Sequence, residues 1–147
     1  MLLLAAAAVA SATTGAPTTA PTTAFTPASK AELQAALTAW NTNAAQALAT
    51  YGVVGTWDVT AITDFSTLLQ DLANFDEDLS GWDTSSVTEM SYMFYGATAF
   101  NHPLAFDSGS VTDLSSMFYN ADAFNGPLAF ATRRVTDLIG MFRPAHP

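Results

Sequence analysis

One phrase recurs along the second half of the chain, and this repeat constrains the fold more than any other feature. VTEMSYMF begins at Val87 and returns as VTDLSSMF at Val111. Five columns of apolar residues share this spacing over about four copies, and the separations in the first column are 25, 24 and 24 residues. The columns are Ile62, Val87, Val111 and Val135; Trp57, Trp82, Phe106 and Phe130; Leu69, Phe94, Phe118 and Phe142; Leu72, Ala97, Ala121 and Ala145; and Phe75, Phe100 and Phe124. A period in the low twenties predicts a solenoid, because units this small bury their apolar faces only by stacking.

Each unit carries two local patterns. Apolar residues three or four apart predict a short α- or 3₁₀-helix, and in one unit they are Val87, Met90, Phe94 and Ala97. Further along, Leu104, Ala105 and Phe106 alternate inward and outward as residues of a strand do. We therefore predict an α/β fold, a short solenoid of about four coils of 24–25 residues that occupies residues 51–147.

A longer helix is predicted ahead of the repeats, over residues 30–50. Ser29 and Glu32 form a capping box at its start, and Gly52 follows its end. Its apolar stripe consists of Leu33, Leu37, Trp40, Ala44 and Leu48. Since this stripe must be buried, we expect the helix to cover the first coil.

Two segments precede this helix. Residues 1–12, MLLLAAAAVASA, are predicted to be a signal peptide, because a short apolar run ends in the small-x-small pattern of a cleavage site. No basic residue precedes the run, so a disordered or degraded start is the alternative. Residues 13–29 are rich in Thr, Pro and Ala and are predicted to be a disordered linker.

Composition excludes several functions. Thirteen acidic against four basic residues give a net charge of -9, which argues against nucleic acid as a partner. The chain has no cysteine and no recognisable catalytic set, so we expect no enzyme activity, cofactor or metal site. Acidic residues recur at one station of each coil, namely Asp64, Glu89, Asp113 and Asp137. We expect them to begin the short helices, and a calcium-binding column is the alternative.

The repeat resembles a known family. Its pattern, F-[ND]-x-x-L-x-x-W-D and then V-T-[DE]-[ML]-S-x-M-F-x-x-A-x-x-F-N, is similar to that of the BspA-like leucine-rich-repeat surface proteins, or mycoplasma-type lipoprotein repeat. The resemblance implies a leucine-rich-repeat type of solenoid that is secreted or displayed at the cell surface for adhesion, without enzymatic activity. Two features depart from it: no cysteine can carry a lipid anchor, and the fourth unit stops at MFRPAHP. We expect that end to be truncated, or else terminated by its prolines.

The expected function is therefore a non-catalytic adhesion or partner-binding module, secreted or at the cell surface. The alternative is a structural component of a cell wall or extracellular matrix. The expected partner is a protein or glycan, and no transmembrane segment is expected in the mature chain. The candidate contact residues are Tyr92, Tyr95 and Tyr119, which fall between the inward positions of the repeat. Alternatively, Tyr95 and Tyr119 cover the edge of the core between coils.

Overall fold

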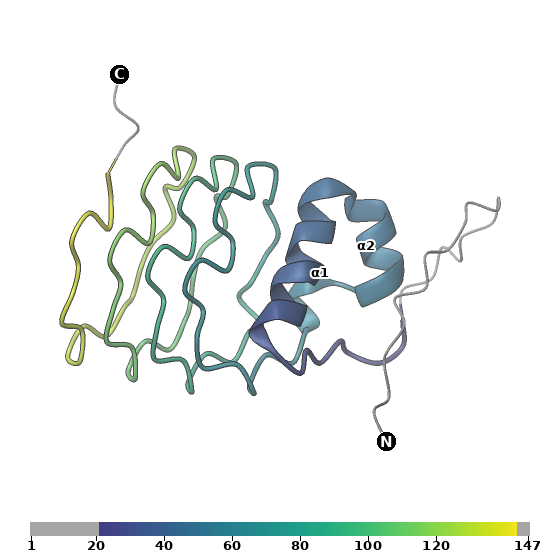
Figure 1. Cartoon of the computed structure of the whole chain (residues 1–147), viewed down its shortest axis with the longest axis horizontal. Coiled ribbons are helices and arrows are strands. Elements are labelled where there is room, and N and C mark those ends of the chain that lie inside the picture. Colours follow the sequence, from purple (N-terminus) through teal and green to yellow (C-terminus); the bar gives the residue numbers. More distant parts are fainter. Residues whose placement is uncertain (1–20, 144–147) are drawn as a thin grey trace.

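The protein consists of a pair of helices followed by a stack of irregular loops (Figure 1). The computed structural model describes residues 21–143. Helix α1 spans Lys30–Thr42, helix α2 spans Ala44–Tyr51, and a 3₁₀ turn, η1, spans Val54–Thr56. The predicted signal peptide, residues 1–12, and the first part of the predicted linker lie outside the described residues.

The helix predicted over residues 30–50 is divided in two. Ser29 accepts a hydrogen bond from the Glu32 N–H and begins α1, as the capping box predicts. The backbone of Asn43 leaves helical geometry at φ -154° and ψ 89°, and its side-chain oxygen accepts from the Gln46 N–H to begin α2. Helix α1 buries four residues, Leu33, Ala36, Leu37 and Trp40, whereas α2 buries only Ala47. The covering of the repeats therefore falls to α1.

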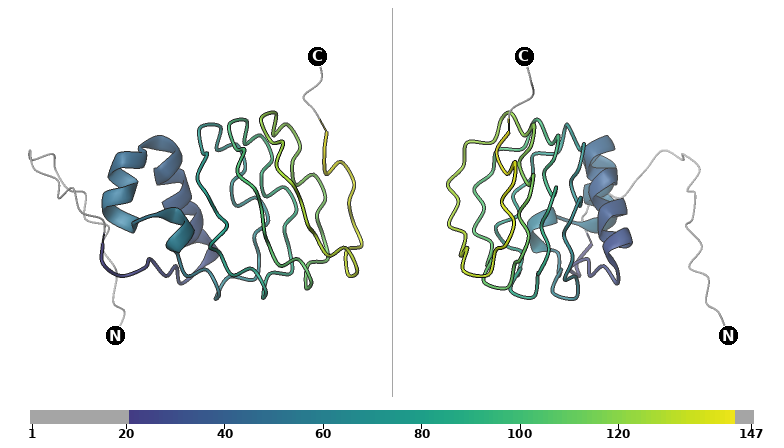
Figure 2. Two further views of the ribbon diagram at one scale, coloured as in Figure 1. Left: turned by 180° about the vertical axis from the view of Figure 1, so that it is seen from behind. Right: turned by 60° about the vertical axis from the view of Figure 1, so that its left-hand side comes forward.

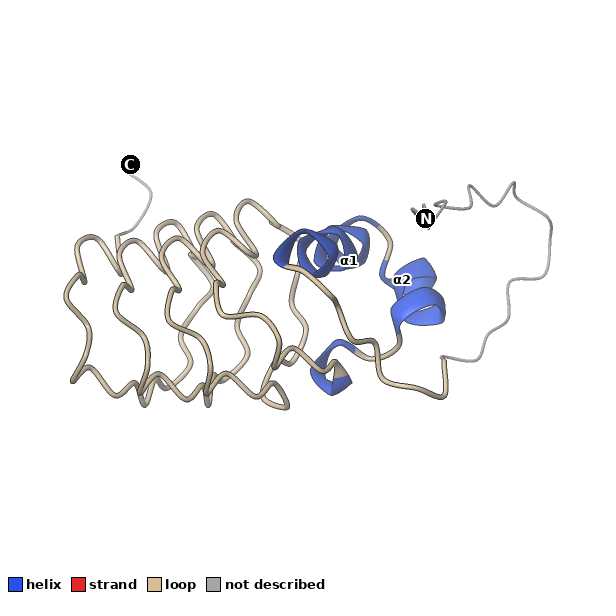
Figure 3. Ribbon diagram, turned by 60° about the horizontal axis from the view of Figure 1, so that its bottom comes forward, coloured by secondary structure: helices blue, strands red, loops and turns tan. Residues whose placement is uncertain are grey.

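The prediction of an α/β solenoid of the leucine-rich-repeat type is wrong. Figure 3 shows loops throughout the repeat region, and the described residues after η1 contain neither a helix nor a strand. In place of a sheet there are isolated parallel bridges, which pair Asp64 with Glu89, Glu89 with Asp113, Asp113 with Asp137, and Leu104 with Leu128. The fold is mostly irregular backbone with two short helices.

Backbone hydrogen bonding explains why the predicted short helix at residues 87–97 does not form. The N–H groups of Met90, Tyr92, Phe94 and Gly96 donate to the carbonyls of Asp113, Ser115, Met117 and Tyr119, at 2.8–3.1 Å. The N–H groups between them stay local, as Met93, Tyr95 and Ala97 donate to the residues three positions earlier. An α-helix needs every interior N–H for its own ladder, so a segment that sends alternate N–H groups to its neighbour forms successive turns instead.

The same bonding joins the other repeats, which lie side by side (Figure 2). Phe65, Thr67, Leu69 and Asp71 donate to Glu89, Ser91, Met93 and Tyr95, and Leu114, Ser116, Phe118 and Asn120 donate to Asp137, Ile139, Met141 and Arg143. All of these N–H groups point toward the C-terminal end, and the carbonyls point toward α1. The bonded pairs keep the sequence period of 24 or 25 residues.

Apolar columns fill the space inside each loop. Val87, Met90, Met93, Phe94 and Ala97 are fully buried, as the spacing predicts. Equivalent rings stack between repeats, with Phe94 and Phe118 at 5.2 Å between ring centroids and Phe118 and Phe142 at 5.4 Å. Side-chain packing therefore follows the sequence period even though regular secondary structure does not.

Polar residues after the phenylalanine column join the repeats at their outer edge. The carboxylate of Asp76 accepts from the Asn101 N–H, and the amide oxygen of Asn101 accepts from the Asn125 N–H, both at 2.9 Å. These residues were expected to be buried, but they are exposed. They nevertheless satisfy the backbone of the next repeat and thereby help to fix the register.

Candidate partner-binding site

The three predicted contact residues form one continuous row of rings. Tyr95 and Tyr119 occupy equivalent stations of neighbouring repeats, and their rings stack at 4.9 Å with an interplanar angle of 9°. Tyr92 joins the row at 5.9 Å from Tyr95. Tyr92 is 42% exposed, and the other two are half-buried. The structure therefore brings together all three residues, with Tyr95 and Tyr119 also covering part of the core edge.

Backbone hydrogen bonds fix each tyrosine from both sides. The Tyr92 N–H donates to the Ser115 carbonyl at 2.9 Å, and the Tyr119 carbonyl accepts from Gly96 at 2.8 Å. The Tyr95 carbonyl likewise accepts from Asp71 at 2.7 Å. Since the positions are set by the stack itself, a partner would meet rings that need little rearrangement.

Arg143 extends the row by one more repeat. It lies 24 residues after Tyr119 and places its guanidinium carbon 6.0 Å from the centre of the Tyr119 ring. Sequence reasoning missed Arg143 as a site residue, although the column spacing from Tyr95 and Tyr119 would have found it. The row therefore combines aromatic faces with a cationic end, an arrangement suited to carbonyl, hydroxyl or carboxylate groups.

The backbone at Tyr92 is in the left-handed region, with φ at +57°. Thr67, Ser116 and Gly140 hold the same station and also have positive φ. This conformation costs an L-residue roughly 1–2 kcal/mol, whereas glycine adopts it freely. A bulky tyrosine at this station gains no backbone stability, so its surface role is the remaining explanation for its presence.

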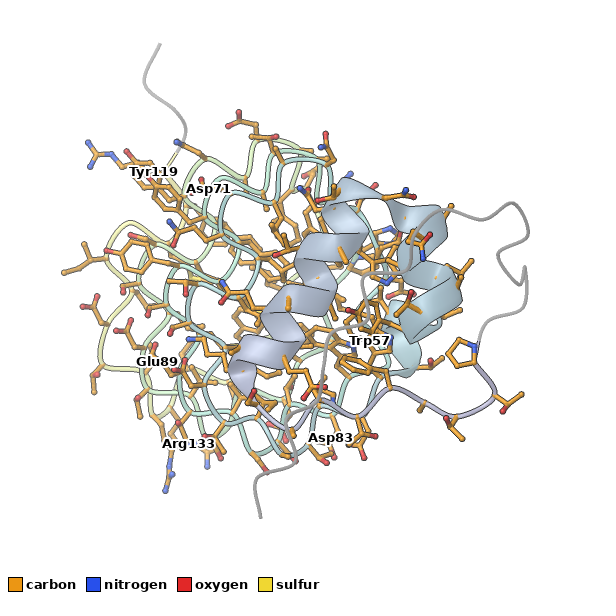
Figure 4. The ribbon with its side chains drawn as sticks, turned by 45° about the vertical axis from the view of Figure 1, so that its right-hand side comes forward. Trp57, Asp71, Asp83, Glu89, Tyr119 and Arg133 are labelled. Carbon is orange, nitrogen blue, oxygen red and sulfur yellow. The ribbon has the colours of Figure 1, made fainter. Side chains whose placement is uncertain are left out.

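Figure 4 shows Tyr119 and Asp71 at one edge of the stack and Asp83 and Arg133 at the opposite edge. Arg133 and Arg134 are both exposed. The tyrosine row therefore does not adjoin this arginine pair, and the positive charge nearest to it is that of Arg143.

The recurrent acidic residues serve the backbone of their own turns. Asp64, Glu89, Asp113 and Asp137 each accept from the N–H two residues on, at 2.7–2.9 Å. The expected helix starts are thus turn starts, because no helix follows. In the described part of the chain, no group of three or more acidic or histidine side chains is close enough to hold a metal ion.

Other acidic residues show the same use of hydrogen bonds. Hydrogen bonds from the side chain and backbone of Thr60 lower the pKa of Asp58, and those of Ser85 lower the pKa of Asp83. Both carboxylates are exposed. They hold a turn rather than a proton-transfer role.

His102 makes contacts that are structural in kind. Its Nε2 lies 3.1 Å from the Asp76 carbonyl oxygen and 3.6 Å from the Asp76 carboxylate. Burial raises the pKa of the nearby Glu77, and the charge of His102 opposes that shift. Among residues 21–143, no serine or threonine hydroxyl is hydrogen-bonded to His102, so no nucleophile and base are paired there.

Neither helix of the described residues has the length and hydropathy needed to cross a membrane.

Comparison with known families gives one match. A family model described as "Mycoplasma protein of unknown function, DUF285" covers residues 42–147, from the last residue of α1 through all the repeats. No curated protein and no solved structure matches the chain. The match bears out the mycoplasma-type repeat that the motif predicts, and it does not extend to the BspA-like assignment.

Proposed function

The chain belongs to the DUF285 family, and we propose that it is a non-catalytic binding module whose partner contacts Tyr92, Tyr95 and Tyr119. The family description assigns no activity, so the proposal depends on the surface of this chain. One observation carries it: three rings from neighbouring repeats form a continuous, backbone-fixed row on the outside of the stack.

The row suits a protein or glycan partner. Stacked phenols present apolar faces to sugar C–H groups or to apolar side chains, and their hydroxyls remain available for hydrogen bonds. Tyrosine and arginine are also the residues that most often dominate binding energies at interfaces. With a net charge of -9, the chain repels the phosphates of a nucleic acid, which we do not propose as a partner.

We propose a secreted or cell-surface location. Support comes from the apolar run of residues 1–12 and from the resemblance of the repeat motif to BspA-like surface proteins, an assignment we retain as part of the proposal. N-terminal sequencing of the protein purified from its source cells tests the location. We expect the mature chain to start near Thr13, and an intact Met1 in a cytosolic fraction would contradict export.

The binding proposal is tested by replacing all three tyrosines with serine. Fluorescently labelled chain is applied to arrays of glycans and to separated surface proteins of host or neighbouring cells. We expect the wild-type chain to bind a defined set and the triple Ser variant to lose it, while a triple Phe variant retains the part that depends on ring faces. Val53→Ser is the matched control, because Val53 is exposed and lies beside the helices.

Two outcomes would change the proposal. Unaltered binding by a triple Ser variant that keeps its near-ultraviolet circular dichroism would remove the row as the binding surface. Absence of binding by the wild-type chain in both assays would favour the alternative, a structural component of a wall or matrix.

A further inference from the structure

The C-terminal end of the stack presents a row of unused backbone donors. In the other repeats, the N–H groups at the equivalent stations donate to the following repeat. In the last repeat the N–H groups of Leu138, Gly140 and Phe142 have no acceptor among the described residues. This edge is therefore an unpaired ladder with the same spacing as three ladders that are paired.

Apolar side chains surround these donors. Ile139 is 77% exposed, Phe142 61% and Leu138 47%. Beside them is an open hollow of about 220 Å³, lined by Phe118, Ala121, Asp122, Phe124, Phe142 and Arg143. In the internal repeats, the corresponding space is filled by the next ring of the Phe75, Phe100 and Phe124 column. The end face thus combines free donors with apolar surface, which is the chemistry of an interface.

Hydrogen-bond direction limits what can cover this face. Since its alternate N–H groups all point outward, a second copy related by a two-fold axis would place donors against donors. The carbonyl side that would match is the first repeat, and α1 covers it: Gln34 donates to the Thr67 carbonyl at 3.2 Å. An intact second copy therefore cannot supply the complementary ladder.

The internal interfaces show what does fit. At each of them the accepting partner is a segment of the repeat motif, in parallel and in register, whose alternate carbonyls receive the donors and whose phenylalanine stacks on the preceding one. We propose that the C-terminal end face docks such a motif segment from another polypeptide. Its carbonyls accept from Leu138, Gly140 and Phe142, and its phenylalanine packs on Phe142 beside the hollow, as in strand addition at an exposed edge.

Charge favours this occupant. Three of the four basic residues, Arg133, Arg134 and Arg143, lie in the last repeat, together with only one of the thirteen acids, Asp137. The last repeat is therefore formally +2, and the rest of the chain, with twelve acids and Lys30, is -11. A motif segment such as residues 111–125 carries Asp113 and Asp122 and no basic residue. Opposite charges thus meet at the proposed interface.

A synthetic peptide with the sequence of residues 111–125, VTDLSSMFYNADAFN, tests the proposal on the full, ¹⁵N-labelled chain. We expect saturable amide shift changes at Leu138, Gly140 and Phe142 and slower hydrogen exchange at these three amides. Ile139→Asp and Phe142→Ser should each weaken binding by about tenfold, because they place charge or remove a ring at the centre of the interface. Val53→Asp, an equally conspicuous change at the helical end, should leave binding unchanged, and a peptide of scrambled order should not bind.

Other results would overturn the proposal. These are shift changes confined to Tyr92, Tyr95 and Tyr119, equal binding by the scrambled peptide, or no saturation at millimolar peptide. Sedimentation that shows dimers of the chain alone, abolished by Ile139→Asp, would identify a second copy as the occupant instead. The side chain of Ile139 is mostly exposed, so its substitution should leave the fold intact, and Phe142→Ser provides an independent check.

Discussion

The two ends of the repeat stack present the same column of side chains in opposite circumstances. Phe65, Met90 and Leu114 are fully buried, and Leu138, the next member, is 47% exposed. At the first end, α1 lies over the column with Leu33 and Leu37 inaccessible to solvent. At the last end, no described element lies over it. Burial in this protein is thus supplied by the neighbouring layer rather than by the repeat itself.

The ends also differ in the polar groups they present. Carbonyls face α1, and α1 meets that side with donors: Lys30 Nζ is 3.0 Å from Asp64 Oδ1 and 2.6 Å from Ser66 Oγ, and Gln34 bonds the Thr67 carbonyl. N–H groups face the other end. Because each repeat has a donor side and an acceptor side, the stack is polar, and its two ends need chemically different covers.

The largest expected effect distinguishes an internal layer from the end layer. Phe106 is buried, so Phe106→Ala should lower the free energy of unfolding by about 3–5 kcal/mol, comparable with the whole stability of a small domain. Phe130, its equivalent in the last repeat, is half-buried, and its truncation should cost clearly less. Urea denaturation of both variants measures the difference. Equal losses would show that the end layer is as well packed as the interior.

A matched leucine pair compares the two ends directly. Leu37→Ala removes a fully buried side chain under α1 and should cost about 2–5 kcal/mol. Leu138→Ala removes the same atoms at the open end and should cost less than about 1 kcal/mol, because much of that side chain is already in water. Thermal melts of the two variants give the comparison. A loss at Leu138 as large as that at Leu37 would mean that the C-terminal end is covered in solution.

These features could be predicted from the sequence to different extents. Column arithmetic identified the inward residues, such as Met90 and Phe94, and it placed Tyr95 beside Tyr119. Apolar periodicity is a direct record of which side chains are buried, so this part succeeded. The positions of the tyrosines followed for the same reason, whereas their role in binding stays a prediction.

Secondary structure could not be predicted in this way. A spacing of three and four residues fits a helix, but it fits equally a series of turns whose alternate N–H groups bond to the next repeat. That choice depends on contacts between repeats, which one unit does not reveal. Gly96, Asn120 and Gly140 were the available signal, because residues tolerant of positive φ at fixed stations are typical of turns rather than of a helix.

Acid should weaken the covered end and spare the open one. Burial opposes ionisation of Asp64, but hydrogen bonds from Ser66 and Lys30 outweigh it and hold the Asp64 pKa below its ordinary value of 3.8. A depressed pKa of this kind stabilises the fold above the unfolded value, and the stabilisation is lost as pH falls through the folded value. Both side chains are partly exposed, so the loss should be only about 0.2–1 kcal/mol.

Hydrogen exchange between pH 5 and pH 2.5, corrected for intrinsic rates, measures this effect. We expect amides of α1 to lose protection below pH 3.8 relative to those of the middle repeats. Asp64→Asn should reproduce the weaker α1 contact at pH 5 and remove its dependence on acid. Unchanged α1 protection in that variant would show that the Lys30 contact does not contribute to holding the helix.

The smallest expected effect concerns the station of positive φ, which is tyrosine in one repeat and glycine in the last. Tyr92→Gly relieves a left-handed conformation that costs an L-residue roughly 1–2 kcal/mol, and it adds unfolded-chain entropy worth about 0.4–1 kcal/mol while removing the contact with Tyr95. These contributions nearly cancel, so the stability should change by less than about 0.5 kcal/mol. The reverse change, Gly140→Ala, should destabilise by about 1 kcal/mol, because φ is +67° there and the new Cβ would lie 3.2 Å from Ser116 Oγ. Chemical denaturation measures both changes. A loss above about 2 kcal/mol for Tyr92→Gly would mean that this ring packs as part of the core edge, and the tyrosine row would then be structural rather than a surface kept for a partner.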